Sequence, residues 1–176
     1  MNTISLRDYR LSDADAIGAL HAQSWFTAYR GILLDSYLDS DLQRERQDYW
    51  RGKLPTLSAK EFIVVAEDDA GSVVGFAAVM DKPENGYDAL LDNLHVRPDL
   101  KGKGLGGQLM KAVALKLRDT GRSSFYLWVL KGNVAAEEFY KSKGGVPEDI
   151  SSTEFGGKTV GKRRFVWTDL GVLIHR

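Results

Sequence analysis

The 176-residue chain contains no cysteine, and this absence removes several classes of protein from consideration. Disulfide scaffolds, thiolate nucleophiles and cysteine-based zinc sites all require that residue. The three histidines, His21, His95 and His175, do not have the spacing of metal ligands either. We therefore expect a protein that works without a metal cofactor.

An excess of charge of either sign is also missing. Lysine plus arginine and aspartate plus glutamate both number 24, so the formal net charge is zero. A neutral chain is a poor match for bulk binding to nucleic acid or to an anionic membrane surface. Any positive site must be local, and Arg97, Lys101 and Lys103, offset by Asp99, form such a local excess.

Long apolar runs are absent as well. No stretch reaches the length of a membrane-spanning helix, and the first ten residues contain no apolar core of a secretory signal. We expect a cytoplasmic protein. The length and the hydrophobic fraction of 43% fit one domain over residues 1–176.

The periodicity of apolar residues predicts an alternation of strands and helices. Strands are expected at 4–9, 62–67, 73–80, 87–96 and 124–130, with two more on either side of the glycines at 156–161, the last at 163–168. Helices are expected after Ser12 or Asp13, after Asp35 or Ser36, after the glycines near residue 104, and after Asn133.

This order predicts an α/β protein of the α+β type. Most of the sheet should be antiparallel, with about seven strands flanked by about four helices. The strand–helix–strand crossover from Leu91 to Leu130 predicts one parallel pair, which makes the sheet mixed.

The stretch from Lys101 to Gly107 is the most informative part of the chain. Four glycines and two lysines stand directly before an apolar helical pattern. Glycine lets a ligand approach the backbone closely, and the first N–H groups of a helix are unpaired at the positive end of its dipole. Together these features predict a phosphate-binding site.

Gly102, Gly104 and Gly107 also satisfy G-x-G-x-x-G, the fingerprint of dinucleotide-binding proteins. That motif should follow a strand at once and precede an acidic residue at the end of the next strand. Here five residues separate strand and glycines, and the strand at 124–130 has no carboxylate. A dinucleotide oxidoreductase therefore remains only as a weaker alternative.

The segment Val96-x-Pro98-x-x-Lys101-Gly-Lys-Gly104-Leu-Gly106 resembles the acyl-coenzyme A signature of the GNAT N-acetyltransferase superfamily. The family pattern is Arg/Gln-x-x-Gly-x-Gly/Ala, so Lys101 is a departure. A second segment, from Leu127 through Asn133 and Ala136 to Phe139, Tyr140 and Gly144, resembles the family's fifth strand and fourth helix. The region from Ser24 to Leu34 matches one bacterial subgroup loosely.

The resemblance implies a GNAT fold in which the fourth and fifth strands splay apart. It also implies acetyl-CoA as co-substrate, with no metal, and direct transfer of the acetyl group to a primary amine. The cofactor-binding residues implied are Leu94, His95, Val96, Lys101, Gly102, Lys103, Gly104, Leu105, Gly106, Gly107, Asn133, Ala136 and Tyr140. Tyr140 matches the general acid that protonates the leaving thiolate, although its position also suits a half-buried helix aromatic.

The general base stays open. Some relatives carry a glutamate on the fifth strand, where this chain has Trp128. Glu67, Asp92, His95 and a water bound by Asn93 are the candidates. Strict alternation would place Asp92 on the same face as Leu94 and Val96, unless a bulge breaks it.

The amine acceptor is not identified by the sequence. Trp25, Tyr29 and Asp92 are candidate substrate-binding residues, and the partner is expected to be a small-molecule or peptide amine. A non-catalytic acyl-CoA-binding or sensing domain of the same fold is the alternative function. The apolar tail at 170–174 can cover the chain's own sheet or the partner in a homodimer.

Overall fold

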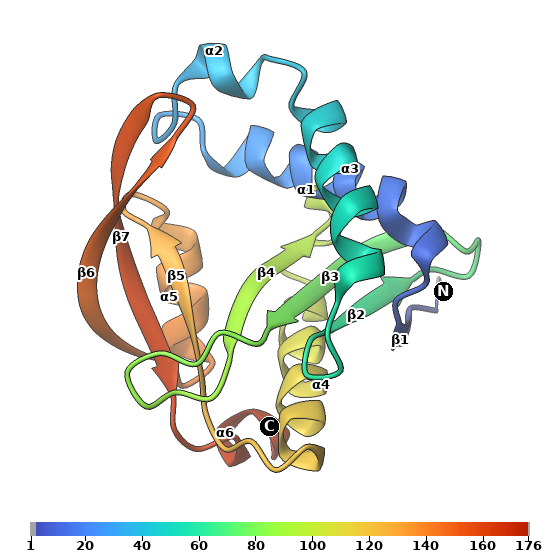
Figure 1. Ribbon diagram of the computed structural model, residues 1–176, viewed down its shortest axis with the longest axis vertical. Coiled ribbons are helices and arrows are strands. Elements are labelled where there is room, and N and C mark those ends of the chain that lie inside the picture. The colour runs from blue at the N-terminus through green and yellow to red at the C-terminus, as the bar shows by residue number, and fades with distance from the viewer. Residues whose placement is uncertain (1–2, 176) are drawn as a thin grey trace.

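The computed structural model describes residues 3–175, which form one seven-stranded sheet with helices on both faces (Figure 1). The strands follow the spatial order β1-β2-β3-β4-β5-β7-β6. Their bounds are β1 Ser5–Asp8, β2 Phe62–Glu67, β3 Val73–Met80, β4 Leu90–Val96, β5 Phe125–Leu130, β6 Val146–Phe155 and β7 Lys158–Trp167. Only β4 and β5 pair in parallel, so the predicted mixed and mostly antiparallel sheet is confirmed.

Residues 3–175 contain six α-helices where about four were expected. They are α1 Ala14–Ala28, α2 Asp35–Leu38, α3 Leu42–Lys53, α4 Leu105–Asp119, α5 Val134–Ser142 and α6 Gly171–Ile174, with short 3-10 turns at Leu11–Asp13, Leu54–Thr56 and Pro98–Leu100. The expected second helix breaks into α2 and α3 because Ser40 bonds back to the carbonyl of Tyr37, and such local side-chain bonds compete with helix. The other additional helix is α6, which forms within the apolar tail at residues 170–174.

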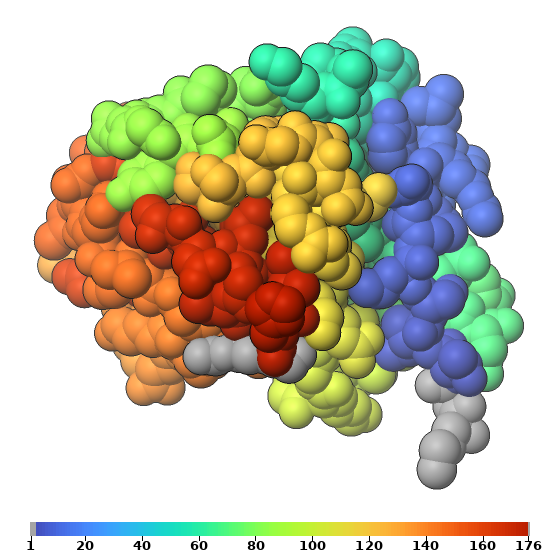
Figure 2. All heavy atoms as spheres, turned by 90° about the horizontal axis from the view of Figure 1, so that it is seen from below, coloured from blue at the N-terminus to red at the C-terminus, as the bar shows by residue number. Residues whose placement is uncertain are grey.

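That tail packs on its own chain. Leu170 and Leu173 are buried in the same core as α4, and α6 contacts α4. Figure 2 shows the segment near the C-terminus, in red, lying against the body of the molecule. Of the two roles left open for residues 170–174, covering the chain's own core is therefore the one observed.

The helices cover the sheet on two faces. On one face Ile17 of α1 and Trp50 of α3 pack on inward-facing residues of β2 and β3 such as Phe76. On the other face Leu109 and Val113 of α4 pack on the opposite residues of the same strands. Burial of a large apolar side chain stabilises the fold by about 1.5–3 kcal/mol, so these two layers hold β2, β3 and β4 as a rigid frame.

The strands β4 and β5 separate after a single registered pair, Leu90 with Tyr126. Beyond that pair β4 bonds only to β3, and β5 bonds only to β7. Figure 1 shows the ribbons of β4 and β5 diverging toward their C-terminal ends. The splay that the family resemblance implied is therefore present.

A β-bulge in β4 changes which way Asp92 points. Leu91 pairs with Val79 and Asn93 pairs with Ala78, which leaves Asp92 without a partner. Leu94 packs on the α4 side, whereas the charged groups that act on Asp92 include Arg46 and Lys53 of α3. The strict alternation that placed Asp92 with Leu94 and Val96 is therefore wrong, because an extra residue in a strand breaks the two-residue period.

The last hairpin is longer than the sequence pattern suggested. β6 and β7 pair over most of their ten residues each and turn at Gly156 and Gly157, both with positive φ. The last strand was expected at 163–168 and begins at Lys158 instead, because Gly161 stays inside the ladder opposite Ser152. Within residues 3–175, no helix is long and apolar enough to cross a membrane.

Candidate active site

A cavity of about 500 Å³ lies where β4 and β5 separate. Such a volume is ordinary for a site that holds a small molecule or cofactor. Its lining combines the end of β4, the glycine loop, the middle of β5, α5 and the end of α1. Predicted site residues that line it are Tyr29, Leu94, His95, Val96, Lys101, Gly102, Gly104, Gly106, Gly107, Asn133, Ala136 and Tyr140.

The glycine loop presents backbone rather than side chains to the cavity. Gly102 and Gly104 have φ values of +76° and +86°, a region that residues with a Cβ rarely adopt. A Cβ added at either position would find no atom within 4 Å, so the space beside both is open. Gly104 is the N-cap of α4, and the first N–H groups of that helix follow it.

The next two glycines serve a different purpose. A Cβ on Gly106 would lie 3.0 Å from Cζ of Phe139, and one on Gly107 would lie 3.1 Å from Nζ of Lys143. These glycines therefore let α5 approach the start of α4. The approach brings the Lys143 ammonium beside Gly107, and Lys143 was not among the predicted site residues although it stands inside the second family segment.

The backbone of β4 facing the cavity has no strand partner. Leu94, His95 and Val96 pair with β3 on one side, and β5 has already moved away on the other. Backbone groups left free along an extended strand can pair with an extended ligand, as in strand addition. Trp128 and Val129 of β5 line the opposite wall.

Tyr140 lies in the wall of this cavity with its ring held by aromatic neighbours. Its ring centroid is 5.2 Å from that of Phe139 and 6.0 Å from that of Phe165. Burial, with a smaller contribution from Tyr29, raises the pKa of the Tyr140 hydroxyl well above its usual value. Burial likewise raises the pKa of Tyr29 to about 12, so both phenols stay protonated at neutral pH.

Asn133 acts as the N-cap of α5, as its place in the sequence predicted. Its side-chain oxygen accepts a hydrogen bond from the backbone N–H of Ala136 at 3.3 Å. Both residues line the cavity. The cap fixes how α5 begins and thereby where Tyr140 stands two turns later.

His95 belongs to a chain of polar groups that starts in the cavity and runs into the core. Its Nδ1 lies 2.8 Å from the Ser24 hydroxyl, and its ring stacks on that of His21 with centroids 4.7 Å apart. His21 in turn accepts a hydrogen bond from the Trp50 indole at 3.0 Å. Burial lowers the pKa of His95 to about 3 and lowers that of His21, so both rings are neutral at physiological pH.

Asp92 is surrounded by protein on most sides but remains accessible to solvent on the α1–α3 side of the sheet. Desolvation raises the pKa of its carboxyl group, while Lys82, Lys53, Arg46 and the Asn93 amide oppose that rise. The amide nitrogen of Asn93 donates to the Asp92 carboxylate at 3.0 Å.

Asn93 and five other candidate residues from the sequence lie outside the lining of this cavity. Lys103 is exposed on the loop, Leu105 is buried beneath it, and Asp92 lies on the α1–α3 side of β4 without lining the cavity. Trp25 is 7% exposed and packs among Leu33, Leu38 and Leu42, so its ring is part of the core.

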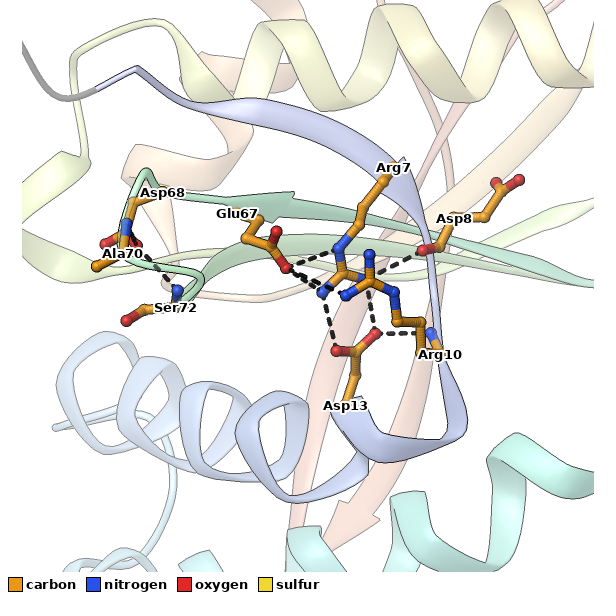
Figure 3. A network of polar contacts seen from close by, with 8 residues as sticks. All are labelled: Arg7, Asp8, Arg10, Asp13, Glu67, Asp68, Ala70 and Ser72. Carbon is orange, nitrogen blue, oxygen red and sulfur yellow. Dashed lines mark hydrogen bonds and ion pairs between the residues drawn. The ribbon is translucent and has the colours of Figure 1, made fainter.

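Glu67 is the fifth. It accepts a hydrogen bond from Nε of Arg7 at 2.7 Å, and Arg7 also bonds to Asp13 (Figure 3). This network lines a separate hollow beside the N-terminal end of α1.

Comparison with known proteins agrees with this geometry. The model of the acetyltransferase (GNAT) family matches residues 22–144. The uncharacterized N-acetyltransferase YuaI of Bacillus subtilis is 29% identical over 97% of this chain and 96% of its own length. The L-methionine sulfoximine/L-methionine sulfone acetyltransferase of Pseudomonas aeruginosa is 34% identical, over 47% of this chain and 49% of its own.

Solved structures share the fold. The PaiA N-acetyltransferase of Thermoplasma acidophilum, solved in complex with coenzyme A, has a TM-score of 0.72 at 19% identity over 91% of this chain and 98% of its own. An N-acetyltransferase of Staphylococcus aureus has a TM-score of 0.69 at 18% identity over 96% and 99%. The family model covers most of the chain, and the sheet, the splay and the glycine loop agree with it, so this protein belongs to the acetyltransferase (GNAT) family and is an N-acetyltransferase.

Proposed function

We propose that this chain, acting as one domain, transfers the acetyl group of acetyl-CoA to a primary amine by direct attack while both substrates are bound. The observation that carries the proposal is the cavity between β4 and β5, which joins a phosphate-binding loop to a protonated tyrosine. A dinucleotide oxidoreductase lacks support, because the loop belongs to a chain of the acetyltransferase family.

The residues present fit acetyl-CoA. The N–H groups that follow Gly104 would hold the pyrophosphate, with Lys101, Lys103 and Lys143 adding positive charge around it. The unpaired edge of β4 at Leu94–Val96 would hold the peptide-like arm. When bound, acetyl-CoA supplies a thioester carbon open to attack.

Tyr140 would serve as the general acid. The amine nitrogen forms a bond to the carbonyl carbon, the carbon–sulfur bond breaks, and the sulfur leaves with the electron pair. The Tyr140 hydroxyl then gives its proton to the thiolate. Its raised pKa keeps that proton in place at neutral pH, and no described residue lies within hydrogen-bond distance of the hydroxyl to compete for it.

Asp92 would take the proton that the amine loses, directly or through a water. Desolvation raises the pKa of its carboxyl group, whereas that of His95 falls to about 3 and leaves a poor base. His95 would instead position the acceptor, with its ring fixed by Ser24 and His21. Glu67 is not retained, because Arg7 engages it in the separate hollow.

The alternative is a non-catalytic acyl-CoA sensor of the same fold, and the two differ in turnover. The test measures free thiol released from acetyl-CoA over a panel of primary amines. The proposal predicts amine-dependent release, and a fall in kcat of about 100-fold or more in Tyr140→Phe with unchanged CoA affinity. Tyr87, whose hydroxyl donates to Glu148, lies outside the lining of the cavity, so Tyr87→Phe is the matched control and should keep wild-type kcat.

CoA binding without thiol release on any amine would favour the sensor. Equal kcat in Tyr140→Phe and wild type at every pH would remove Tyr140 as the acid.

A further inference from the structure

We propose that the amine acceptor carries an acid group close to its amine, as an amino acid does, and that Lys162 on the Trp128 face binds that acid group. This inference rests on the proposed acetyl transfer and assigns the substrate class of the same site. Lys162 was not among the residues that the sequence analysis selected.

Trp128 connects the cavity to the neighbouring strand β7. It lines the cavity and stands on β5, at the position where some relatives carry a glutamate. Lys162 and Arg164 of β7 lie on the same face of the sheet, since Trp128 pairs with Arg164 and Leu130 pairs with Lys162. Nζ of Lys162 lies 4.3 Å from the centre of the Trp128 ring, so the ammonium is held over that indole.

Lys162 has no anionic partner among residues 3–175. No carboxylate among these residues lies within ion-pair distance of it; the Trp128 indole face contacts its ammonium, and Glu84 and Asp92 act on it only at longer range. Burial, together with the nearby Lys82, lowers the pKa of Lys162 more than Glu84 and Asp92 raise it. A bound carboxylate would relieve both effects.

The nearby carboxylates are already engaged. Glu84 bonds to Arg164 at 3.1 Å and accepts from the Tyr126 hydroxyl at 3.2 Å. Arg164, which is only 2% exposed, also pairs with Glu148 and Asp149. These acids therefore balance the buried arginine, and none of them forms an ion pair with Lys162.

A second group of cations surrounds Asp92, outside the lining of the cavity. Arg46 of α3 faces Asp92, and its Nε is buried without a hydrogen-bond partner, although its Nη2 pairs with Glu45. Lys53 and Lys82 also act on Asp92, and Glu61 pairs with Lys53. Asp92, which forms no ion pair among residues 3–175, thus lies close to several cations.

This arrangement suits a zwitterion rather than a polyamine. Asp92 would accept hydrogen bonds from the amine, while Lys162 takes the acid group across the mouth of the cavity. A diamine or polyamine would instead bring a second positive charge against Lys162, Lys82 and Arg46, and like charges at close range repel.

The test compares kcat/KM of the wild type for L-amino acids, for their carboxamides and for diamines, by thiol release, with each amine corrected for its neutral fraction. The proposal predicts that the best acceptors are acids and that each exceeds its carboxamide by about 10-fold or more. Lys162→Gln should reduce that ratio by about 10- to 100-fold through KM for the acid, with carboxamide turnover retained.

Lys162→Arg should keep the preference for acids over carboxamides that Lys162→Gln loses, because it keeps the positive charge. Lys116→Gln, which removes a lysine on α4 at the opposite face of the sheet, is the matched control and should keep the wild-type ratio. Carboxamide turnover and CoA affinity report that each variant is folded, so loss of the ratio cannot come from unfolding.

Three results separate the possibilities. If no amine supports thiol release, the proposed acetyl transfer fails and the inference fails with it. If carboxamides or diamines serve the wild type as well as acids do, acetyl transfer stands and the acid-bearing acceptor is overturned. If acids are preferred but Lys162→Gln keeps the ratio, Lys162 is not the residue that binds the acid group.

Discussion

Replacing Gly102 by alanine tests whether the glycine loop binds phosphate or is only a turn. Gly102 has a φ of +76° and lines the cavity. An added Cβ meets no atom within 4 Å, so the substitution carries no clash and only the backbone cost remains. That cost is about 1–2 kcal/mol for a residue with a Cβ in the left-handed region.

Gly121 offers a matched control for the same change. It follows the end of α4 with a φ of +75°, a Cβ there also meets no atom within 4 Å, and it lies outside the lining of the cavity. Gly102→Ala and Gly121→Ala should therefore lose similar stability. In a chain of this length the loss corresponds to a fall in Tm of about 2–8 °C, measured by differential scanning fluorimetry.

The two variants should differ in CoA affinity. The methyl group of Gly102→Ala occupies space that a phosphate needs beside the backbone N–H groups. Loss of one charge-assisted hydrogen bond costs about 1.5–3 kcal/mol, so Kd for CoA, measured by calorimetry, should rise by about 10- to 100-fold. Gly121→Ala should keep the wild-type Kd. Equal CoA affinity in the two variants would refute the phosphate-binding role and leave Gly102 as a turn residue.

Three further predictions concern stability. His95 has a folded pKa of about 3 against 6.5 for the free side chain. The contribution of the neutral ring to the free energy of unfolding is therefore complete above pH 6.5 and is lost as pH falls toward 3, at up to about 1.4 kcal/mol per pH unit. Urea unfolding at pH 7, 6 and 5 should show a shallower loss of that free energy in His95→Gln than in the wild type. Trp50→Phe removes the hydrogen bond to buried His21 and should lower the free energy of unfolding by about 1–3 kcal/mol. A loss below about 0.5 kcal/mol, which is the usual effect of a surface substitution, would contradict that account. Arg164→Met leaves three partly exposed carboxylates without their cation. It should lower the free energy of unfolding by about 1–3 kcal/mol at pH 7 and by less at pH 4, where those groups begin to protonate. An equal loss at both pH values would show that the charge is not responsible.

The fold was predictable from sequence where the signal is local. Leu105, Leu109, Val113 and Leu117 recur at four-residue spacing, and all four are buried on one side of α4. Asn133 could be assigned as a helix cap for the same reason, because a cap depends on the next three residues. The tail at 170–174 could not be placed, since apolar residues alone do not say which surface they cover.

The candidate site divides in the same way. Trp25 and Glu67 looked like site residues in sequence, but one is packed in the core and the other is held by Arg7, which is sixty positions away along the chain. Lys143 and Lys162 carried no sequence signal, because each becomes informative only through a neighbour on another element, Gly107 for one and Trp128 for the other.

The sequence by itself determined the glycine loop, the helix that follows it, the order of the elements and the family, because glycine dihedrals, caps and apolar periods are properties of a few consecutive residues. Tertiary structure alone decided the side of the sheet on which Asp92 lies, since the bulge exists only in the register between β3 and β4. It also decided that an unpaired cation lies over Trp128, because β5 and β7 meet only when the sheet is assembled.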